Sequence, residues 1–102
     1  MVLDKKVFEG IHIVDFGWAL AGPLSVKYFA DYGATVICIE SFRRPDLLRI
    51  SAPFKDGMPN VNRAGFFSYF AANKYSISLD LTQATAKEIA KKLVARADIV
   101  AD

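Results

Sequence analysis

Cysteine is almost absent from this chain of 102 residues, which has only Cys38. A lone thiol forms no internal disulfide, and the apolar residues around it predict an inert buried side chain, so we expect a protein of the reducing cytoplasm. Histidine is equally scarce. Because His12 has no second histidine and no paired cysteine nearby, we interpret it as a core or rim residue and predict no metal site.

Long apolar runs are also missing. Asp15 separates the uncharged runs over residues 10–14 and 16–26, and Lys27 ends the second. A membrane-spanning helix needs about 20 apolar residues, so we expect no membrane partner. Residues 1–6 do not have the pattern of a signal peptide and lead toward the first expected strand.

The net charge is small, at +2, which gives little reason to expect nucleic acid as a partner. A local basic group of Arg43, Arg44 and Arg49 suits a small anionic ligand better. With 53% hydrophobic and 24% charged residues the chain is globular, and its length predicts one domain with a core of its own.

The order of strand-like and helix-like segments predicts an α/β fold. Residues 11–16 are apolar on both faces except at His12 and Asp15, as in a strand of a parallel sheet covered on both sides. A mostly buried helix with a thin polar stripe of Lys27 and Asp31 should begin at Pro23 and end at Gly33, a residue suited to a left-handed cap.

The other expected elements alternate in the same way. They are a strand over 35–40, a long loop over 41–63 with a helical turn near 46–50, a short aromatic helix over 65–72, a strand over 75–81, a helix capped by Thr82 and running to Ala97, and a strand over 98–101. We therefore predict one Rossmann-like segment over residues 1–102, with a parallel sheet and flanking helices. Since its fourth strand has no following helix, we expect it to be incomplete, the N-terminal part of a larger doubly wound domain.

The turn after the first strand is the expected ligand site, because the next helix points its N–H groups there. A dinucleotide site would have glycines in this turn, but Trp18 and Leu20 are bulky. Only Glu40 matches that fingerprint, at the ribose-binding position, so NAD-dependent chemistry is a weak alternative. Asp15, at the end of the strand, could either brace the turn or take part in proton chemistry.

A set of short motifs in fixed order resembles the opening of the family III CoA-transferases, which include formyl-CoA and carnitine CoA-transferases and α-methylacyl-CoA racemases. The motifs lie at residues 10–16, 21–23, 30–37, Glu40, Asp46, Arg49, 73–74, 76–81 and 97–100. Each motif alone is weak, but their order and spacing together are specific.

The resemblance implies a Rossmann-like domain that binds acyl-CoA, as substrate rather than as a tightly bound cofactor, in an interlocked homodimer. The family reaction moves CoA from an acyl-CoA to a carboxylic acid through an aspartate that is acylated and then thioesterified. None of the aspartates in this chain matches that position, so we expect no catalytic residue here and no activity from the chain alone. The racemase branch of the family is an alternative.

The resemblance also implies positions for the site. The turn after the first strand would line the thioester and pantetheine end, and the pair at 73–74 would lie near the nucleotide end. Arg43, with Arg44 beside it, could serve the phosphates or could belong to a solvated loop. The expected CoA-binding residues are Trp18, Ala19, Leu20, Arg43, Asn73 and Lys74.

The chain departs from the family where Ser41 and Phe42 follow the second strand, so adenine stacking would move to Phe42 or Arg43. Asp46 and Arg49 match family positions that we interpret as bracing their own loop, as a possible pair. A competing hypothesis is a small non-catalytic α/β binding or oligomerisation module, which would use the exposed sheet edge and the aromatic residues 66–70.

Overall fold

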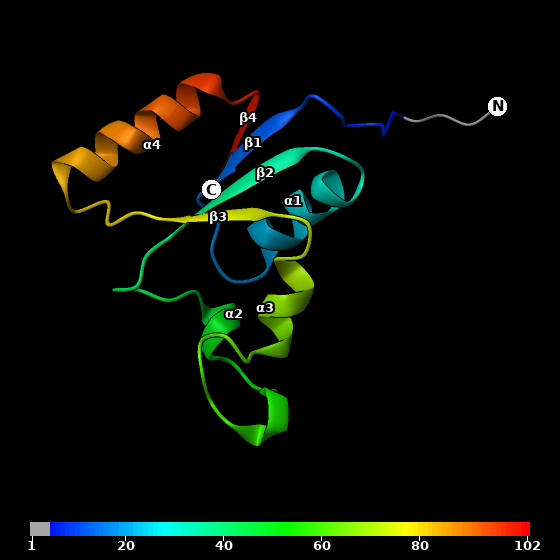
Figure 1. The fold of residues 1–102 in the computed structure, drawn as a ribbon, viewed down its shortest axis with the longest axis vertical. Helices are drawn as coiled ribbons and strands as arrows, with labels where there is room; N and C mark the ends of the chain where they lie inside the picture. Colours follow the sequence, from blue (N-terminus) through cyan, green and yellow to red (C-terminus); the bar gives the residue numbers. More distant parts are fainter. Residues whose placement is uncertain (1–4) are drawn as a thin grey trace.

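The fold is a four-stranded parallel sheet with flanking helices (Figure 1). The structure is a computed structural model that describes residues 5–102, so the opening residues 1–4, part of the segment expected to lead into the first strand, lie outside the described part. The elements are β1 His12–Asp15, α1 Ala21–Asp31, β2 Thr35–Glu40, α2 Leu47–Ile50, the 3-10 turn η1 Lys55–Gly57, α3 Gly65–Phe70, β3 Tyr75–Ser78, α4 Ala84–Arg96 and β4 Ile99–Ala101.

The strands lie in the order β3-β2-β1-β4, and all three pairings are parallel. The chain moves outward from β1 to β3, and α4 then returns it to the other side of β1. The strand order therefore reverses at β1, and in open α/β sheets ligands bind at such a switch point, outside the carboxyl ends of the strands. The predicted α/β, Rossmann-like sheet is confirmed.

Two apolar layers cover the sheet, one on each face. Successive side chains of a strand point to opposite faces, so Val36 and Ile39 of β2 belong to different layers. The layer under α1 contains Ile13, Val26, Ala30, Ala34 and Val36. The layer under α4 contains Leu79, Ala86 and Ala90, with Phe16, Ile39 and Ile77 packed against them. This double covering explains why β1 and β2 have nearly continuous apolar sequences.

Helix α1 begins two residues earlier than predicted, at Ala21. Pro23 is the third residue of the helix, still within the first turn, where its missing N–H breaks no helical hydrogen bond. The predicted end is confirmed, since Gly33 follows the helix with φ of +110°.

The polar stripe of Lys27 and Asp31 on α1 is half-buried. Lys27 pairs with Asp31 at 2.6 Å, and its ammonium lies 4.9 Å from the centre of the Tyr69 ring of α3. Large exposed side chains are instead those of Tyr28 in the helix and Tyr32 just after it. Because α3 packs against α1, the sequence of α1 alone could not predict which side faces water.

The sequence predicted that Thr82 caps helix α4, and this prediction is wrong. The residue before the helix is Gln83, which makes no capping hydrogen bond with its side chain, and the Thr82 hydroxyl bonds to Asp80 at 2.6 Å. The strand β3 ends at Ser78 rather than at residue 81.

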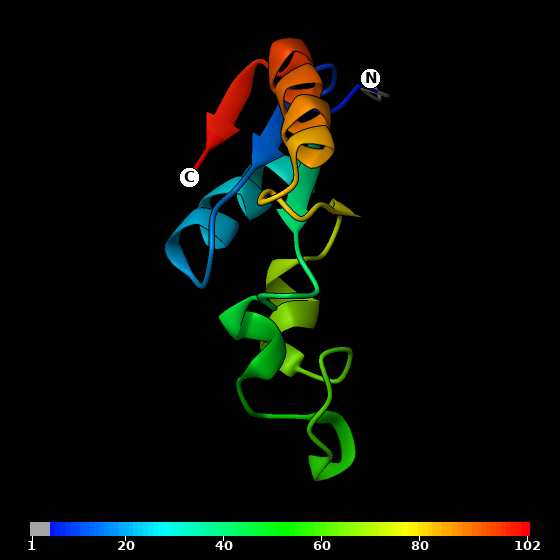
Figure 2. The same ribbon diagram turned by 90° about the vertical axis from the view of Figure 1, so that its left-hand side faces the viewer.

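The predicted long loop over residues 41–63 contains the expected helical turn, α2, and also η1. Together with α3 it extends away from the sheet, as the lower part of Figure 2 shows. No helix among the described residues is long and apolar enough to cross a membrane. The extension, residues 41–70, forms the side wall of the site described below.

Candidate functional site

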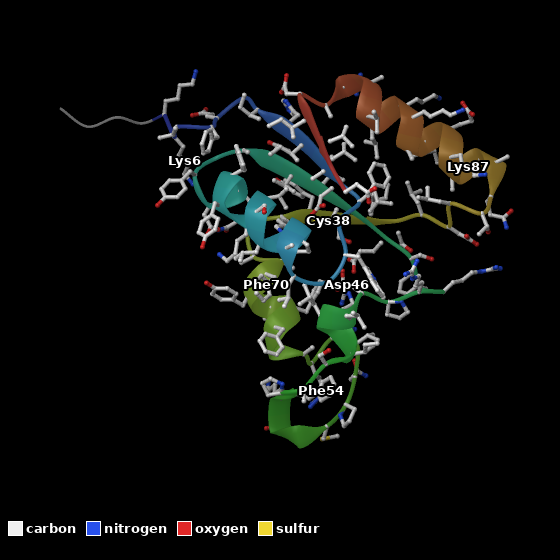
Figure 3. The ribbon with its side chains drawn as sticks, turned by 180° about the vertical axis from the view of Figure 1, so that it is seen from behind. Lys6, Cys38, Asp46, Phe54, Phe70 and Lys87 are labelled. Carbon is white, nitrogen blue, oxygen red and sulfur yellow. The ribbon has the colours of Figure 1, made fainter. Side chains whose placement is uncertain are left out.

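A cleft of about 1130 Å³ lies at the carboxyl ends of the strands. All four strands contribute to it, through Asp15 of β1, Glu40 of β2, Ser76 of β3 and Val100 of β4. Figure 3 labels three further lining residues, Cys38 on the sheet and Asp46 and Phe70 beside it. The cleft thus lies at the switch point, with the extension as its wall.

A close backbone contact shapes the turn after β1. Asp15 is 2% exposed, and its Oδ1 accepts the N–H of Gly17 at 2.7 Å. A Cβ on Gly17 would lie 2.7 Å from that oxygen and 3.2 Å from the Cα of Gly22 in α1. Of the two roles considered for Asp15, the structure shows that it braces the turn.

Asp46 connects this turn to α2. Its Oδ1 accepts the N–H of Leu48 at 2.8 Å, which caps α2, and both of its carboxylate oxygens lie 3.3 Å from the N–H of Ala19. The suggested pairing of Asp46 with Arg49 is wrong, because Asp46 reaches the turn after β1 and Arg49 binds Glu40. Ala19 lies 27 residues before Asp46, so the spacing of Asp46 from Arg49 gave no signal of this contact.

Arg49 connects the extension to the sheet, because it pairs with Glu40 at the end of β2. Its Nε and Nη2 donate to the two carboxylate oxygens of Glu40 at 2.7 and 3.0 Å, and both side chains are 18% exposed. Its guanidinium carbon lies 3.5 Å from the centre of the Phe67 ring, and Nη1 donates to the carbonyl of Val61 at 2.9 Å. The hydrogen bonds from Arg49 and Ser76 hold the pKa of Glu40 below its ordinary value of 4.5. Glu40, the one match to an NAD fingerprint, is therefore already engaged within the protein.

Lys74 places a cation in the wall of the cleft. Its Nζ donates to the carbonyl of Pro23 at 2.7 Å, and the side chain is half-buried. Burial lowers the pKa of Lys74, although the nearby Cys38 and Asp15 oppose the shift. None of the ion pairs formed within residues 5–102 includes Lys74. Within the described part of the chain its hydrogen-bond partner is therefore a neutral backbone carbonyl.

Cys38 and Asp15 form a hydrogen-bonded pair in the cleft floor. The Sγ of Cys38 lies 3.7 Å from Oδ2 of Asp15. Burial, with the Asp15 charge beside it, raises the pKa of Cys38 to about 12, and burial also raises the pKa of Asp15. The thiol is therefore protonated at neutral pH, which agrees with the predicted inert cysteine.

We expect the Cys38 thiol to react at least about a hundredfold more slowly than free cysteine with an aromatic disulfide reagent at pH 8, because only the thiolate is nucleophilic. The release of the coloured thiol measures the rate. The same protein unfolded in urea is the control and should react at the rate of an ordinary cysteine. Equal rates for folded and unfolded protein would contradict the described environment of Cys38.

The structure brings Trp18 and Lys74 together among the residues that line the cleft, and it adds Arg44. The guanidinium carbon of Arg44 lies 4.3 Å from the centre of the Trp18 ring. Arg43 is not among the lining residues, since it is exposed and pairs with Asp80 at 3.1 Å. The arginine pair was visible in the sequence, but which of its members faces the cleft was not.

The other expected site residues take different places. Ala19 contributes its backbone to the turn, and Leu20 is 53% exposed at the start of α1. Asn73 donates to Asp31 at 2.9 Å and lines a second cavity of about 440 Å³. Phe42 is 89% exposed. Within residues 5–102 no three side chains of the metal-binding types are grouped as a metal site would require.

Known proteins of one family are similar to this chain in sequence and in fold. The family model described as CoA-transferase family III matches residues 8–102. A formyl-CoA:oxalate CoA-transferase of Bradyrhizobium sp. (strain ORS 278) is 32% identical over 97 residues, which are 95% of this chain and 22% of that protein. A cinnamoyl-CoA:phenyllactate CoA-transferase of Clostridium sporogenes is 33% identical over 97 residues, or 95% and 23% of the two chains.

A solved structure shows the same arrangement. The crystal structure of a CAIB/BAIF family protein from Brucella suis superposes with a TM-score of 0.81 at 30% identity, and the match covers 95% of this chain and 25% of that one. The present chain thus spans about a quarter of the length of the relatives that it matches. The family match over residues 8–102 shows that the chain belongs to CoA-transferase family III.

Proposed function

We propose that this chain is the N-terminal, CoA-binding portion of an enzyme that transfers CoA between an acyl-CoA and a carboxylic acid. The observation that carries the proposal is the half-buried ammonium of Lys74, which lines the cleft and forms no ion pair within residues 5–102. Such a charge is costly in a cleft wall unless an anion neutralises it, and the phosphates of CoA are suitable anions.

The other properties of the cleft also suit CoA. This ligand needs an apolar place for adenine, cations for its phosphates, and a groove for the pantetheine chain. The cleft is large, and Trp18, Phe67 and Phe70 give it aromatic walls. We place the thioester and pantetheine along the turn at 17–20, the nucleotide end near Asn73 and Lys74, and the exposed pair Arg43 and Arg44 within reach of the phosphates.

The matching relatives suggest the class of reaction. Their names pair a CoA thioester with a free acid, as in formyl-CoA with oxalate and cinnamoyl-CoA with phenyllactate. We propose that the full protein uses such a pair, with an aspartate outside this chain that is acylated and then thioesterified. This chain would bind and orient CoA without catalysing transfer, and the full enzyme would act as a cytoplasmic homodimer.

The oligomerisation module remains a second candidate, on the basis of a separate observation. Helix α3 exposes 44% of Phe66 and 60% of Tyr69. Exposed aromatic side chains beside one another are typical of protein interfaces. Under this alternative the purified chain would self-associate and would not bind CoA.

A calorimetric titration of CoA into the purified chain tests the proposal. We expect saturable binding that becomes about tenfold weaker in Lys74→Met, because the ammonium loses a charge-assisted contact with a phosphate. Lys87→Met is the matched control, since Lys87 is exposed on α4, away from the cleft, and should leave the affinity unchanged.

NAD serves as the control ligand, and a urea melt of each variant checks that it is folded. If CoA shows no saturable binding to the folded chain, or if NAD binds equally well, the proposal is wrong. If CoA affinity fell equally in the Lys74 and Lys87 variants, the conclusion would be that CoA does not bind in this cleft.

A further inference from the structure

Ala19 has an unusual backbone conformation for an alanine. Ala19 lies in the turn between β1 and α1, and its φ is +64°, in the left-handed region. The Cβ of an L-residue is crowded in this region, so an alanine left to itself prefers a negative φ. Something in the structure must therefore hold the turn in this shape.

The carboxylate of Asp46 is placed to do so. Both of its oxygens lie 3.3 Å from the N–H of Ala19, across 27 residues of sequence. The same side chain is fixed from the other side, because its Oδ1 accepts the N–H of Leu48 at 2.8 Å. The acceptor is thus also the N-cap of α2, and a charged acceptor makes a stronger hydrogen bond than a neutral one.

The conformation of Ala19 also sets the direction of its neighbour. Trp18 precedes Ala19 and lines the cleft, with the guanidinium of Arg44 stacked 4.3 Å from its ring centre. On the other side of the turn, Asp15 fixes the N–H of Gly17 at 2.7 Å. Two carboxylates therefore hold the turn, one from the sheet and one from α2.

We propose that Asp46 is a positioning residue, which holds Ala19 in the left-handed conformation so that the turn at 17–20 presents its ligand-facing shape. The inference rests on the proposed binding of CoA and adds a residue that acts through the turn instead of touching the ligand. Only the fraction of molecules with the correct turn can bind, so the apparent affinity falls in proportion to that fraction.

Replacing Asp46 by serine separates its two contacts. Serine caps helices about as well as aspartate, so α2 should keep its cap, but its shorter side chain cannot reach Ala19. We expect Asp46→Ser to bind CoA about tenfold more weakly, which is the order expected when a left-handed alanine loses the bond that holds it. Its midpoint in urea should stay close to that of the wild type.

The matched rescue is Ala19→Gly, because glycine adopts positive φ without steric cost. In the Asp46→Ser background this second change should recover most of the lost affinity. Ala19→Gly alone is measured beside it, so that any direct effect of removing the Ala19 methyl group on binding is subtracted. Calorimetric titration of CoA into the four proteins measures this coupling. Unchanged or tighter binding in Asp46→Ser, or a loss that Ala19→Gly does not recover, would overturn the proposal.

A second measurement separates this inference from CoA binding itself. The coupling constant between the amide and Cα protons of residue 19, with its carbon shifts, reports φ by NMR without any ligand. We expect the left-handed values in the wild type and their loss in Asp46→Ser. If the values persist in the variant, the positioning role is wrong even if CoA binds. If they are lost but the wild type does not bind CoA, it is the proposed function that fails.

Discussion

Replacing Arg49 by methionine is expected to lower the free energy of unfolding by about 3 kcal/mol, because removal of one partner leaves a largely buried charge uncompensated. The charge left behind is Glu40, whose two oxygens both accept hydrogen bonds from Arg49. The variant also loses the contact with the Phe67 ring and the bond to the Val61 carbonyl. Urea unfolding followed by tryptophan fluorescence measures the change.

The matched control is Arg43→Met. Arg43 also pairs with a carboxylate, that of Asp80 at 3.1 Å, but its side chain is 74% exposed. Exposed ion pairs are screened by water and contribute little, so this variant should keep the wild-type midpoint. Equal losses for the two arginine variants would contradict the role assigned to Arg49 as the link between wall and sheet.

The Arg49 variant should also change the dependence of stability on pH. In the folded protein the pKa of Glu40 is lowered, so its pairing stabilises the fold above the ordinary value of 4.5 and is lost as the pH falls through the folded pKa. Without Arg49, burial favours the protonated acid. The difference in unfolding free energy between wild type and Arg49→Met should therefore be smaller at about pH 4 than at pH 7.

Replacing Gly17 by alanine is expected to cost about 2 kcal/mol, because an added methyl group in a tight contact forces the backbone to move. The new Cβ would lie 2.7 Å from Oδ1 of Asp15 and 3.2 Å from the Cα of Gly22. Asp15 cannot turn away freely, since it is buried and accepts the N–H of Gly17 itself. The turn must shift, so CoA affinity should fall along with stability.

Gly65→Ala is the control for this substitution. A Cβ on Gly65 would lie 3.6 Å from Pro53, an ordinary contact, and Gly65 is in the first turn of α3. Alanine is the better helix former, so the variant should be as stable as the wild type or slightly more so. Urea unfolding measures the stability of both glycine variants. If Gly17→Ala were as stable as the wild type, the turn and α1 would be less closely packed than described.

The sheet could be predicted because local patterns determine its strands. The runs at β1 and β2 are apolar on both faces, and Gly33 marks the end of α1 as expected. The ends of elements were less accurate where tertiary contacts decide them. Thr82 has the chemistry of a helix cap, but Asp80 binds its hydroxyl, and the cap position goes to Gln83.

The location of the candidate site could be predicted from the sequence, but the contacts between its residues could not. The turn after β1 and the position of Lys74 followed from the sequence pattern and the family resemblance. The partners of Asp46 and Arg49 did not, because the bonds to Ala19 and Glu40 depend on how the extension folds back onto the sheet. The left-handed alanine was likewise hidden, since its residue type favours the opposite conformation.

Mapping CoA onto the backbone amides of the labelled chain by NMR tests the central claim most directly. Binding in the cleft predicts saturable shift changes at the turn 17–20, at residues 41–44 after β2, and at residues 73–76, with one common dissociation constant. The outer face of α4 should not respond. No saturable change, or changes centred on α4, would contradict a CoA site at the carboxyl ends of the strands.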